Sequence, residues 1–249
     1  MIEAIHLTKR FGSLVALDNL NLSIPRGEVF CFLGPNGAGK TTTIKLMTGL
    51  LNPTSGRVLI DGIDMHQQPV QAKQCIGYVP DMPFLYDRLT AEEFFRFTGD
   101  LYGVDPRRIE SELDASLALF GLTDHRHALL KDLSHGMRQR LIYAATFLHE
   151  PRILFVDEPL VGLDPYTIRL LKDLLREKAR NGMTIFLTTH ILALAEDVGD
   201  RIGIIMHGRM IALGTMEELR HQGHEGSLED VFLKLTAANY GGGTAHAAH

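Results

Sequence analysis

The residues best suited to chemistry lie in the glycine-rich segment 34–42, which follows a short apolar run and precedes a helical pattern. Glycines let successive backbone N–H groups turn inward around phosphate oxygens, and the N-terminus of the following helix adds partial positive charge. The phosphate-binding residues that this pattern predicts are Gly34, Pro35, Asn36, Gly37, Ala38, Gly39, Lys40, Thr41 and Thr42. The alternative is a glycine-rich turn with a chance lysine.

Two of these side chains have more specific tasks in the phosphate-loop pattern. Lys40 is placed to reach the β- and γ-phosphates of a nucleoside triphosphate, where it would act in catalysis as well as in binding. The hydroxyl of Thr41 is suited to ligate Mg²⁺. The segment therefore predicts a site for ATP with Mg²⁺.

Two adjacent carboxylates, Asp157 and Glu158, follow the apolar run 153–156. Open α/β sheets bind ligands at the carboxyl ends of such strands. Asp157 would hold Mg²⁺ through its water shell, and Glu158 would polarise the water that attacks the γ-phosphate. Ordinary acidic residues at a strand end are the alternative interpretation of this segment alone.

The elements that position these residues follow from the apolar pattern. Alternation over 2–7 and 14–24 predicts a small antiparallel sheet, and 202–206 with 210–213 predicts a hairpin around His207-Gly208. Buried or half-buried strands are expected at 29–33, 57–60, 76–79, 153–156 and 184–188. The order strand, helix, strand after residue 153 implies a parallel sheet, so the fold class is α/β.

Capping signals set the expected helices. Helices are predicted over 41–50, from Thr90 to Gly103, from Asp105 to near Gly121, from Ser134 to Pro151, from Pro165 to Gly182 and from Ile191, with two short ones from near Thr215 and Ser227. The mostly helical block at about 86–150 interrupts the α/β pattern. The glycine-rich tail 241–249 is expected to be disordered, and its histidines suggest no metal site.

Composition narrows the classes of partner. The 249 residues carry 25 Lys and Arg against 30 Asp and Glu, a net charge of −5, so we expect no nucleic-acid partner and no direct binding to an acidic membrane surface. Cys31 sits in an apolar run and is predicted to be a small buried hydrophobe, as in a reducing cytoplasm. No apolar run approaches the roughly 18 residues of a spanning helix. We therefore expect a soluble chain.

The segment Leu133-Ser134-His135-Gly136-Met137 discriminates among nucleotide-hydrolysing folds. Leu133, Ser134 and Gly136 match the signature Leu-Ser-Gly-Gly-Gln, whereas His135 and Met137 depart from it. With the preceding segments in their order, the chain resembles the ATP-binding subunits of ABC transporters over nearly its whole length. The resemblance implies a P-loop NTPase fold of the ABC ATPase type, with a mostly parallel central sheet and an N-terminal antiparallel β-subdomain. It also implies one domain over 1–240, with the helical subdomain at about 86–150 inserted in it.

The resemblance also assigns roles to single residues. Ser134 and Gly136 would face the γ-phosphate held by a second subunit, and Asp164 would lie in a dimer-contacting loop, although Ser134 and Asp164 can equally be helix caps. His190 occupies the place of the switch histidine that holds the γ-phosphate and the attacking water in line, whereas a lone histidine is commonly structural. Phe11 would stack on adenine, or it packs as an ordinary hairpin aromatic.

The clearest departure from the family is Asp81, which stands where glutamine is usual. An aspartate could still meet Mg²⁺ or its water. Its added negative charge near ATP and Glu158 would alter metal affinity or rate. The segment 81–88 leads into the helical block, so the resemblance makes it the expected docking groove for a membrane subunit.

The implied function is ATP binding and hydrolysis that powers transport through a separate transmembrane subunit, at the cytoplasmic face of the cell membrane. The variant signature and the segment 228–232 resemble exporters of the ABC-2 type. The working pair would be a homodimer or a heterodimer with a second ABC ATPase, and the cargo would be set by the membrane subunit. The competing class is a soluble ABC ATPase in translation or DNA repair, which usually carries two cassettes or long coiled-coil insertions. A nucleotide kinase would leave Ser134, Gly136 and Glu158 unexplained.

Overall fold

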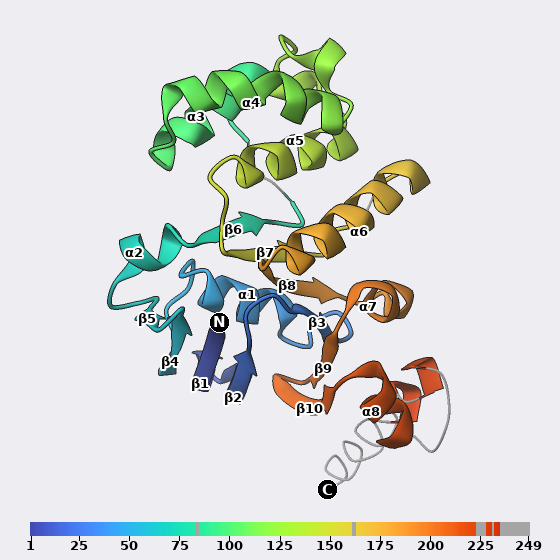
Figure 1. Ribbon diagram of the computed structural model, residues 1–249. Coiled ribbons are helices and arrows are strands. Elements are labelled where there is room, and N and C mark those ends of the chain that lie inside the picture. Colours follow the sequence, from blue (N-terminus) through green and yellow to red (C-terminus); the bar gives the residue numbers. More distant parts are fainter. Residues whose placement is uncertain (83–84, 161–162, 223–227, 231, 235–249) are drawn as a thin grey trace, which may run out of the picture.

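The computed structural model describes residues 1–82, 85–160, 163–222, 228–230 and 232–234, and its ribbon divides into two sheets and a helical block (Figure 1). The first sheet is antiparallel, with strand order β2-β1-β4-β5. Its strands are β1 (Ile2–Phe11), β2 (Leu14–Ile24), β4 (Ser55–Ile60) and β5 (Ile63–Asp64).

The second sheet is the central one, with order β10-β9-β3-β8-β7-β6. All its neighbours pair in parallel except β9 and β10, which form an antiparallel hairpin. Its strands are β3 (Val29–Leu33), β6 (Ile76–Val79), β7 (Ile153–Asp157), β8 (Thr184–Thr189), β9 (Arg201–Met206) and β10 (Arg209–Gly214). The expected antiparallel subdomain and mostly parallel central sheet are confirmed.

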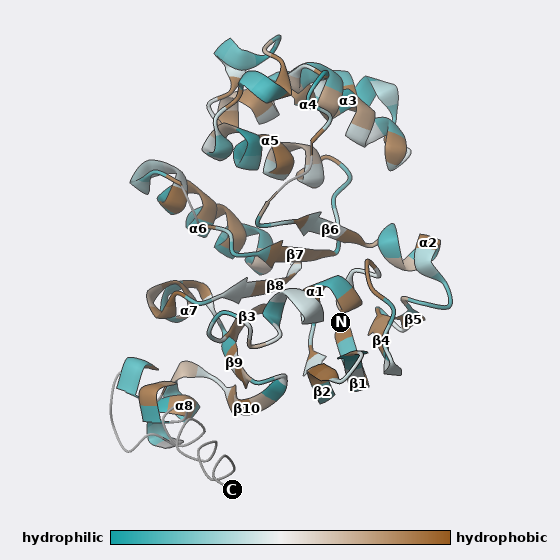
Figure 2. Ribbon diagram, turned by 180° about the vertical axis from the view of Figure 1, so that it is seen from behind, coloured by the Kyte–Doolittle hydropathy of each residue, from teal (hydrophilic) through white to brown (hydrophobic). Residues whose placement is uncertain are grey.

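Two hydrophobic cores enclose the central sheet because its strands bury both faces. Phe30 and Phe32 of β3 point into the core shared with the antiparallel sheet, whereas Cys31 points into the core on the other face. Cys31 is fully buried, and burial raises the pKa of its thiol, so the side chain stays uncharged. It therefore packs as a small buried hydrophobe. Figure 2 shows β7 mostly in hydrophobic colours, while α4 and α6 mix hydrophobic and hydrophilic residues.

Three longer helices lie between β6 and β7 in the chain and form the helical block above the sheet in Figure 1. They are α3 (Ala91–Leu101), α4 (Pro106–Leu119) and α5 (His135–Phe147), with 3₁₀ turns at Thr123–His125 and Leu130–Asp132. Their starts follow the sequence signals: Thr90 forms a complete capping box with Glu93, and Asp105 and Ser134 accept backbone N–H groups as N-caps.

The remaining helices flank the strands. They are α1 (Lys40–Met47), α2 (Pro69–Lys73), α6 (Pro165–Arg180), α7 (Leu192–Val198) and α8 (Met216–Gln222). Helix α1 packs in the core between the two sheets, whereas α6 and α7 contribute to the core on the other face. The phosphate-loop helix is therefore held on two sides.

Several boundaries differ from the sequence predictions. Strand β1 continues to Phe11 because its pairing with β2 runs to the hairpin tip, and α5 ends at Phe147, one turn before Pro151. Strand β5 and helix α2 were not predicted, since both are too short for a periodic signal. Ser227, near which a short helix is expected to begin, lies outside the described residues. The whole tail 241–249 lies outside them as well.

No helix within the described residues is both long enough and apolar enough to cross a membrane.

The capping box at Thr90 predicts a measurable stability effect. Replacing Thr90→Ala removes the acceptor for the Glu93 N–H and should lower the free energy of unfolding by about 1 kcal/mol. Thr98→Ala is the matched control on the same helix, because its hydroxyl donates only back to the Phe94 carbonyl, and it should change stability by less than about 0.5 kcal/mol. Urea unfolding of both variants measures the difference, and equal effects would show that the box contributes nothing specific.

Candidate active site

The parallel strands bring four of the predicted segments to one edge of the central sheet. Gly34 follows β3, His190 follows β8, Glu158 follows β7 and Asp81 lies two residues beyond β6. These strands are adjacent in the order β3-β8-β7-β6. Because parallel strands end at the same edge, residues far apart in the sequence meet there.

The loop between β3 and α1 is fixed by close backbone packing. Gly34 has no room for a side chain, because a Cβ atom would lie 2.4 Å from the carbonyl oxygen of Ile205 on β9. Gly39 has φ of 113° and begins α1 without a side-chain cap. The Gly208 N–H donates to the Ala38 carbonyl at 2.8 Å, which ties the β9–β10 hairpin to the loop.

Lys40 is buried at the first position of α1, with 5% of its surface exposed. Its ammonium donates to the carbonyl oxygens of Gly34 at 2.7 Å and Pro35 at 3.2 Å. The same Nζ lies 3.3 Å from Oε1 of Glu158. A buried cation needs such partners because desolvation alone would strongly disfavour its charge.

Glu158 joins this lysine to His190. Its Oε2 lies 2.9 Å from His190 Nδ1, so one carboxylate contacts both groups. Glu158 has φ of 48°, an uncommon left-handed backbone for a residue other than glycine. Its N–H donates to the Thr188 carbonyl at 3.1 Å, which holds that conformation against β8.

Asp157 is 3% exposed and sits behind Glu158 at the end of β7. The Thr188 hydroxyl donates to its carboxylate, and the Thr41 hydroxyl lies near enough to lower its pKa. Burial raises the pKa of Asp157, and the charges of Glu158 and Asp81 raise it further, while the two hydroxyls oppose that shift. The Asp157 carboxylate therefore lies near the Thr41 hydroxyl and near two further acidic side chains, Glu158 and Asp81, a setting that favours a cation.

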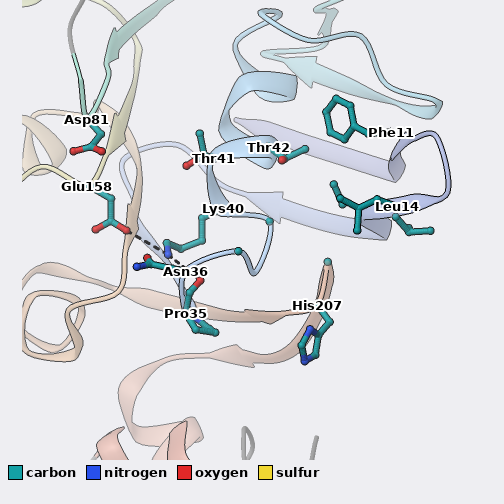
Figure 3. A pocket seen from close by; sticks show the side chains of 15 residues that line it. Phe11, Leu14, Pro35, Asn36, Lys40, Thr41, Thr42, Asp81, Glu158 and His207 are labelled. Carbon is teal, nitrogen blue, oxygen red and sulfur yellow. Dashed lines mark hydrogen bonds and ion pairs between the residues drawn. The ribbon is translucent and has the colours of Figure 1, made fainter. Parts of the chain in front are cut away.

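A pocket of about 480 Å³ opens over these groups (Figure 3). Ten predicted site residues line it: Phe11, Pro35, Asn36, Gly37, Gly39, Lys40, Thr41, Thr42, Asp81 and Glu158. Gly34 and Ala38 belong to the same loop but contact the β9–β10 hairpin. Asp157 lies near the pocket residue Thr41, and His190 hydrogen-bonds to the pocket residue Glu158. In Figure 3, Asp81 and Glu158 lie at one end and Phe11 and Leu14 at the other.

Five lining residues escaped the sequence analysis: Leu14, Val15, Ala16, His207 and Gly208. Leu14 pairs with Phe11 across the β1–β2 hairpin, and both side chains are largely exposed. The sequence signal that could have found Leu14 is its position three residues after Phe11, across the Gly12-Ser13 turn. The sequence predicts the hairpin around His207, but its place beside the phosphate loop depends on tertiary pairing of β9 with β3.

Three predicted residues are not brought to this pocket. Ser134 and Gly136 belong to the start of α5, and Asp164 caps α6 by accepting the Thr167 N–H at 3.0 Å. Of the described residues that line the pocket, none comes from α5 or α6. Within one chain, these residues therefore act as helix caps and helix N-termini at a separate place.

Known proteins resemble this chain in both sequence and fold. The ABC transporter family matches residues 17–161. The probable multidrug ABC transporter ATP-binding protein YbhF of Escherichia coli is 40% identical over 240 residues, and the match covers 94% of this chain but 41% of the length of YbhF. The linearmycin resistance ATP-binding protein LnrL of Bacillus subtilis is 36% identical over 219 residues, with 88% of this chain and 70% of LnrL covered.

Solved structures agree with the sequence relatives. The structure of an ATP-binding subunit of an ABC transporter matches with a TM-score of 0.90 and 34% identity, covering 95% of this chain and 99% of the other. A dimeric ATP-binding cassette in a post-hydrolysis state, bound to ADP and phosphate, matches with a TM-score of 0.79 and 26% identity over 86% of this chain and 98% of the other. These relatives are transporter cassettes and give no support to the alternative of an ATPase in translation or DNA repair. The phosphate loop, the paired carboxylates and these matches lead to one conclusion: the chain belongs to the ABC transporter family.

Proposed function

We propose that this cassette binds Mg-ATP in the pocket over α1 and hydrolyses it as one member of a dimer, which powers export through a separate transmembrane subunit. The observation that carries the proposal is the contact of Glu158 with both Lys40 and His190 at the pocket wall. We also propose that residues 1–240 form one domain, with the helical block at about 86–150 inserted in it.

Glu158 would act as the base for the attacking water. Phosphate oxygens entering the loop would compete for the ammonium of Lys40, because a triphosphate carries more negative charge than one carboxylate. Glu158 would then be released toward the water, while His190 keeps hold of its other oxygen. Such positioning and electrostatic stabilisation supply most of the catalysis in phosphoryl transfer.

Thr41 and Asp157 are the residues that would hold Mg²⁺. The Thr41 hydroxyl lies near enough to the Asp157 carboxylate to lower its pKa, and Mg²⁺ in nucleotide sites takes one or two protein oxygens together with phosphates and water. Asp81 lines the same pocket and would add a further carboxylate oxygen at its edge. When bound, Mg²⁺ neutralises charge that develops on the phosphates.

Glu158→Gln tests the proposed hydrolysis. The amide keeps the shape of the side chain but cannot accept the water proton, so turnover should fall by about 10²-fold or more while ATP binding is retained. Steady-state ATP hydrolysis and equilibrium binding of ATP measure the two effects. Glu177→Gln, on the exposed side of α6, is the matched control and should behave as the parent does. Undiminished hydrolysis by Glu158→Gln would exclude Glu158 as the base.

The separate positions of the two helix starts support a dimer with shared sites. Ser134, Gly136 and Asp164 lie away from the pocket of their own chain, and a helix N-terminus is well suited to bind phosphate. A related cassette with ADP and phosphate is dimeric. We propose that α5 of one subunit covers the nucleotide held by the other around a two-fold axis.

Mixing two defective chains tests the shared site for the homodimeric form. Ser134→Asp retains an N-cap but places a carboxylate against the partner's phosphate, and Lys40→Ala abolishes binding to the loop. A mixed dimer of the two contains one intact site, so an equimolar mixture should recover roughly a quarter of parental turnover by random pairing.

The control mixture combines Lys40→Ala with the double variant Lys40→Ala, Ser134→Asp, in which no dimer has an intact site. Activity in the first mixture that stays at the level of this control would refute a site completed in trans.

Phe11 is proposed to stack on the adenine ring. Phe11 is 46% exposed at the pocket edge and is therefore accessible, and Lys9 Nζ lies 5.0 Å from its ring centroid. Leu14 lies beside it on the neighbouring strand. Such a pair offers an aromatic face and an apolar edge to a base.

Phe11→Ala should weaken ATP binding roughly tenfold, since stacking of one base is worth about 1–3 kcal/mol. Binding of inorganic pyrophosphate, which has no base, should stay unchanged. Phe11→Tyr preserves the aromatic face and serves as the control. Calorimetric titration with both ligands separates the cases, and an equal loss for pyrophosphate would argue that Phe11 only supports the loop.

An exposed aromatic pair supports docking of a membrane subunit beside the segment 81–88. Tyr86 and Phe97 pack edge to face with centroids 5.3 Å apart, and both are exposed together with Met82. Aromatic residues and methionine are enriched at protein interfaces. Relatives named for multidrug transport and linearmycin resistance support export as the direction, which would place this cassette at the cytoplasmic face of the cell membrane.

The double change Tyr86→Ser, Phe97→Ser should reduce co-purification with the transmembrane subunit roughly tenfold, because interface energy concentrates in such aromatic anchors. ATP binding by the cassette should be unaffected. Leu50→Ser removes another exposed apolar side chain, following α1, and serves as the control. Unchanged co-purification of the double variant would move the docking surface elsewhere.

A further inference from the structure

Gln139 is a buried polar residue in the middle of the signature helix α5. Only 2% of its surface is exposed, and its neighbours along the helix, Leu141, Ile142 and Tyr143, belong to the hydrophobic core. Its side-chain Nε2 donates to the carbonyl oxygen of Pro80 at 3.3 Å. Its Oε1 is buried and has no hydrogen-bond partner in the described part of the chain.

This amide connects two regions with different tasks. Pro80 follows β6 directly and precedes Asp81, which lines the ATP pocket. Ser134, the N-cap of α5, lies five residues before Gln139. The hydrogen bond therefore joins the loop that carries Asp81 to the helix that starts with the signature segment.

Packing alone does not explain a glutamine here. A buried amide that satisfies only one of its two polar atoms is costly relative to an apolar side chain of the same shape. Unsatisfied buried polar atoms are few in native proteins. The neighbouring core residues show that this face of α5 accepts apolar side chains. The remaining gain from Gln139 is its directed bond to the Pro80 carbonyl.

We propose that Gln139 is a positioning residue that transmits the nucleotide state of the pocket from the Asp81 loop to the N-terminal turns of α5. The inference rests on the proposed function, since the signal is nucleotide bound over Lys40. Because α5 is proposed to cover the nucleotide of the second subunit, the same bond would couple the two sites of a dimer. A direct hydrogen bond between a loop and a helix is a physical route for such coupling.

Gln139→Met tests this role because methionine fills a similar volume without either polar group. Tyr143→Phe is the matched control: Tyr143 lies one turn further along α5, is fully buried, and its hydroxyl likewise has no partner among the described residues. Both changes remove an orphaned polar atom from one helix, but only the first removes the bond to Pro80. Thermal unfolding should show that both variants are at least as stable as the parent.

The decisive measurement is hydrogen exchange of residues 134–140, with and without Mg-AMP-PNP, at concentrations where the chain is monomeric. In the parent and in Tyr143→Phe, the nucleotide should slow exchange roughly three- to tenfold, the range that one net hydrogen bond provides. In Gln139→Met the change should drop below about twofold, although AMP-PNP affinity stays within about twofold of the parent.

Three results would overturn the inference. These are full nucleotide-dependent protection in Gln139→Met, an equal loss in Tyr143→Phe, or no protection in a parent chain that binds AMP-PNP. A parent chain that does not bind AMP-PNP would instead refute the proposed function, and the inference would fall with it.

Discussion

The buried ammonium of Lys40 is the interaction around which the rest of the site is arranged. Taking a lysine out of water is tolerated only where its charge is matched, and here two loop carbonyls and the Glu158 carboxylate provide that match. The loop must therefore curl so that its carbonyl oxygens face Lys40. Loops that curl in this way can turn backbone N–H groups toward phosphate oxygens, although those of Gly34 and Ala38 are bonded here to the Thr189 and Pro35 carbonyls. One electrostatic requirement thus determines both the loop geometry and the position of the carboxylate.

That requirement constrains the fold at a larger scale. Glu158 can reach Lys40 because β7 and β3 end at the same edge of a parallel sheet, with only β8 between them. The strands are held in register by two cores, and a side chain at Gly34 would collide with β9. The antiparallel sheet supplies the other end of the pocket through Phe11 and Leu14. Each layer of the fold therefore contributes one wall to a single site.

The helical block relates to this site in two ways. Its third helix begins with Ser134, away from the pocket of its own chain, which suits contact with a second subunit. The same helix also reaches back to the pocket through Gln139 and Pro80. A helix that is exposed at one end and hydrogen-bonded to the pocket loop further along can respond to one nucleotide while it contacts another. The block thus has a position suited to communication between sites.

The amino-acid sequence by itself determined the local chemistry: the loop 34–42, the adjacent carboxylates, the helix caps at Thr90, Asp105 and Ser134, and the class of fold. These features depend on neighbours within a few residues, where spacing and backbone propensity suffice. Only the tertiary structure decided that Glu158 contacts both Lys40 and His190, that Leu14 and His207 line the pocket, and that Gln139 bonds to Pro80. Each of these pairs joins separate elements. Their proximity depends on strand order and core packing, which no local pattern specifies.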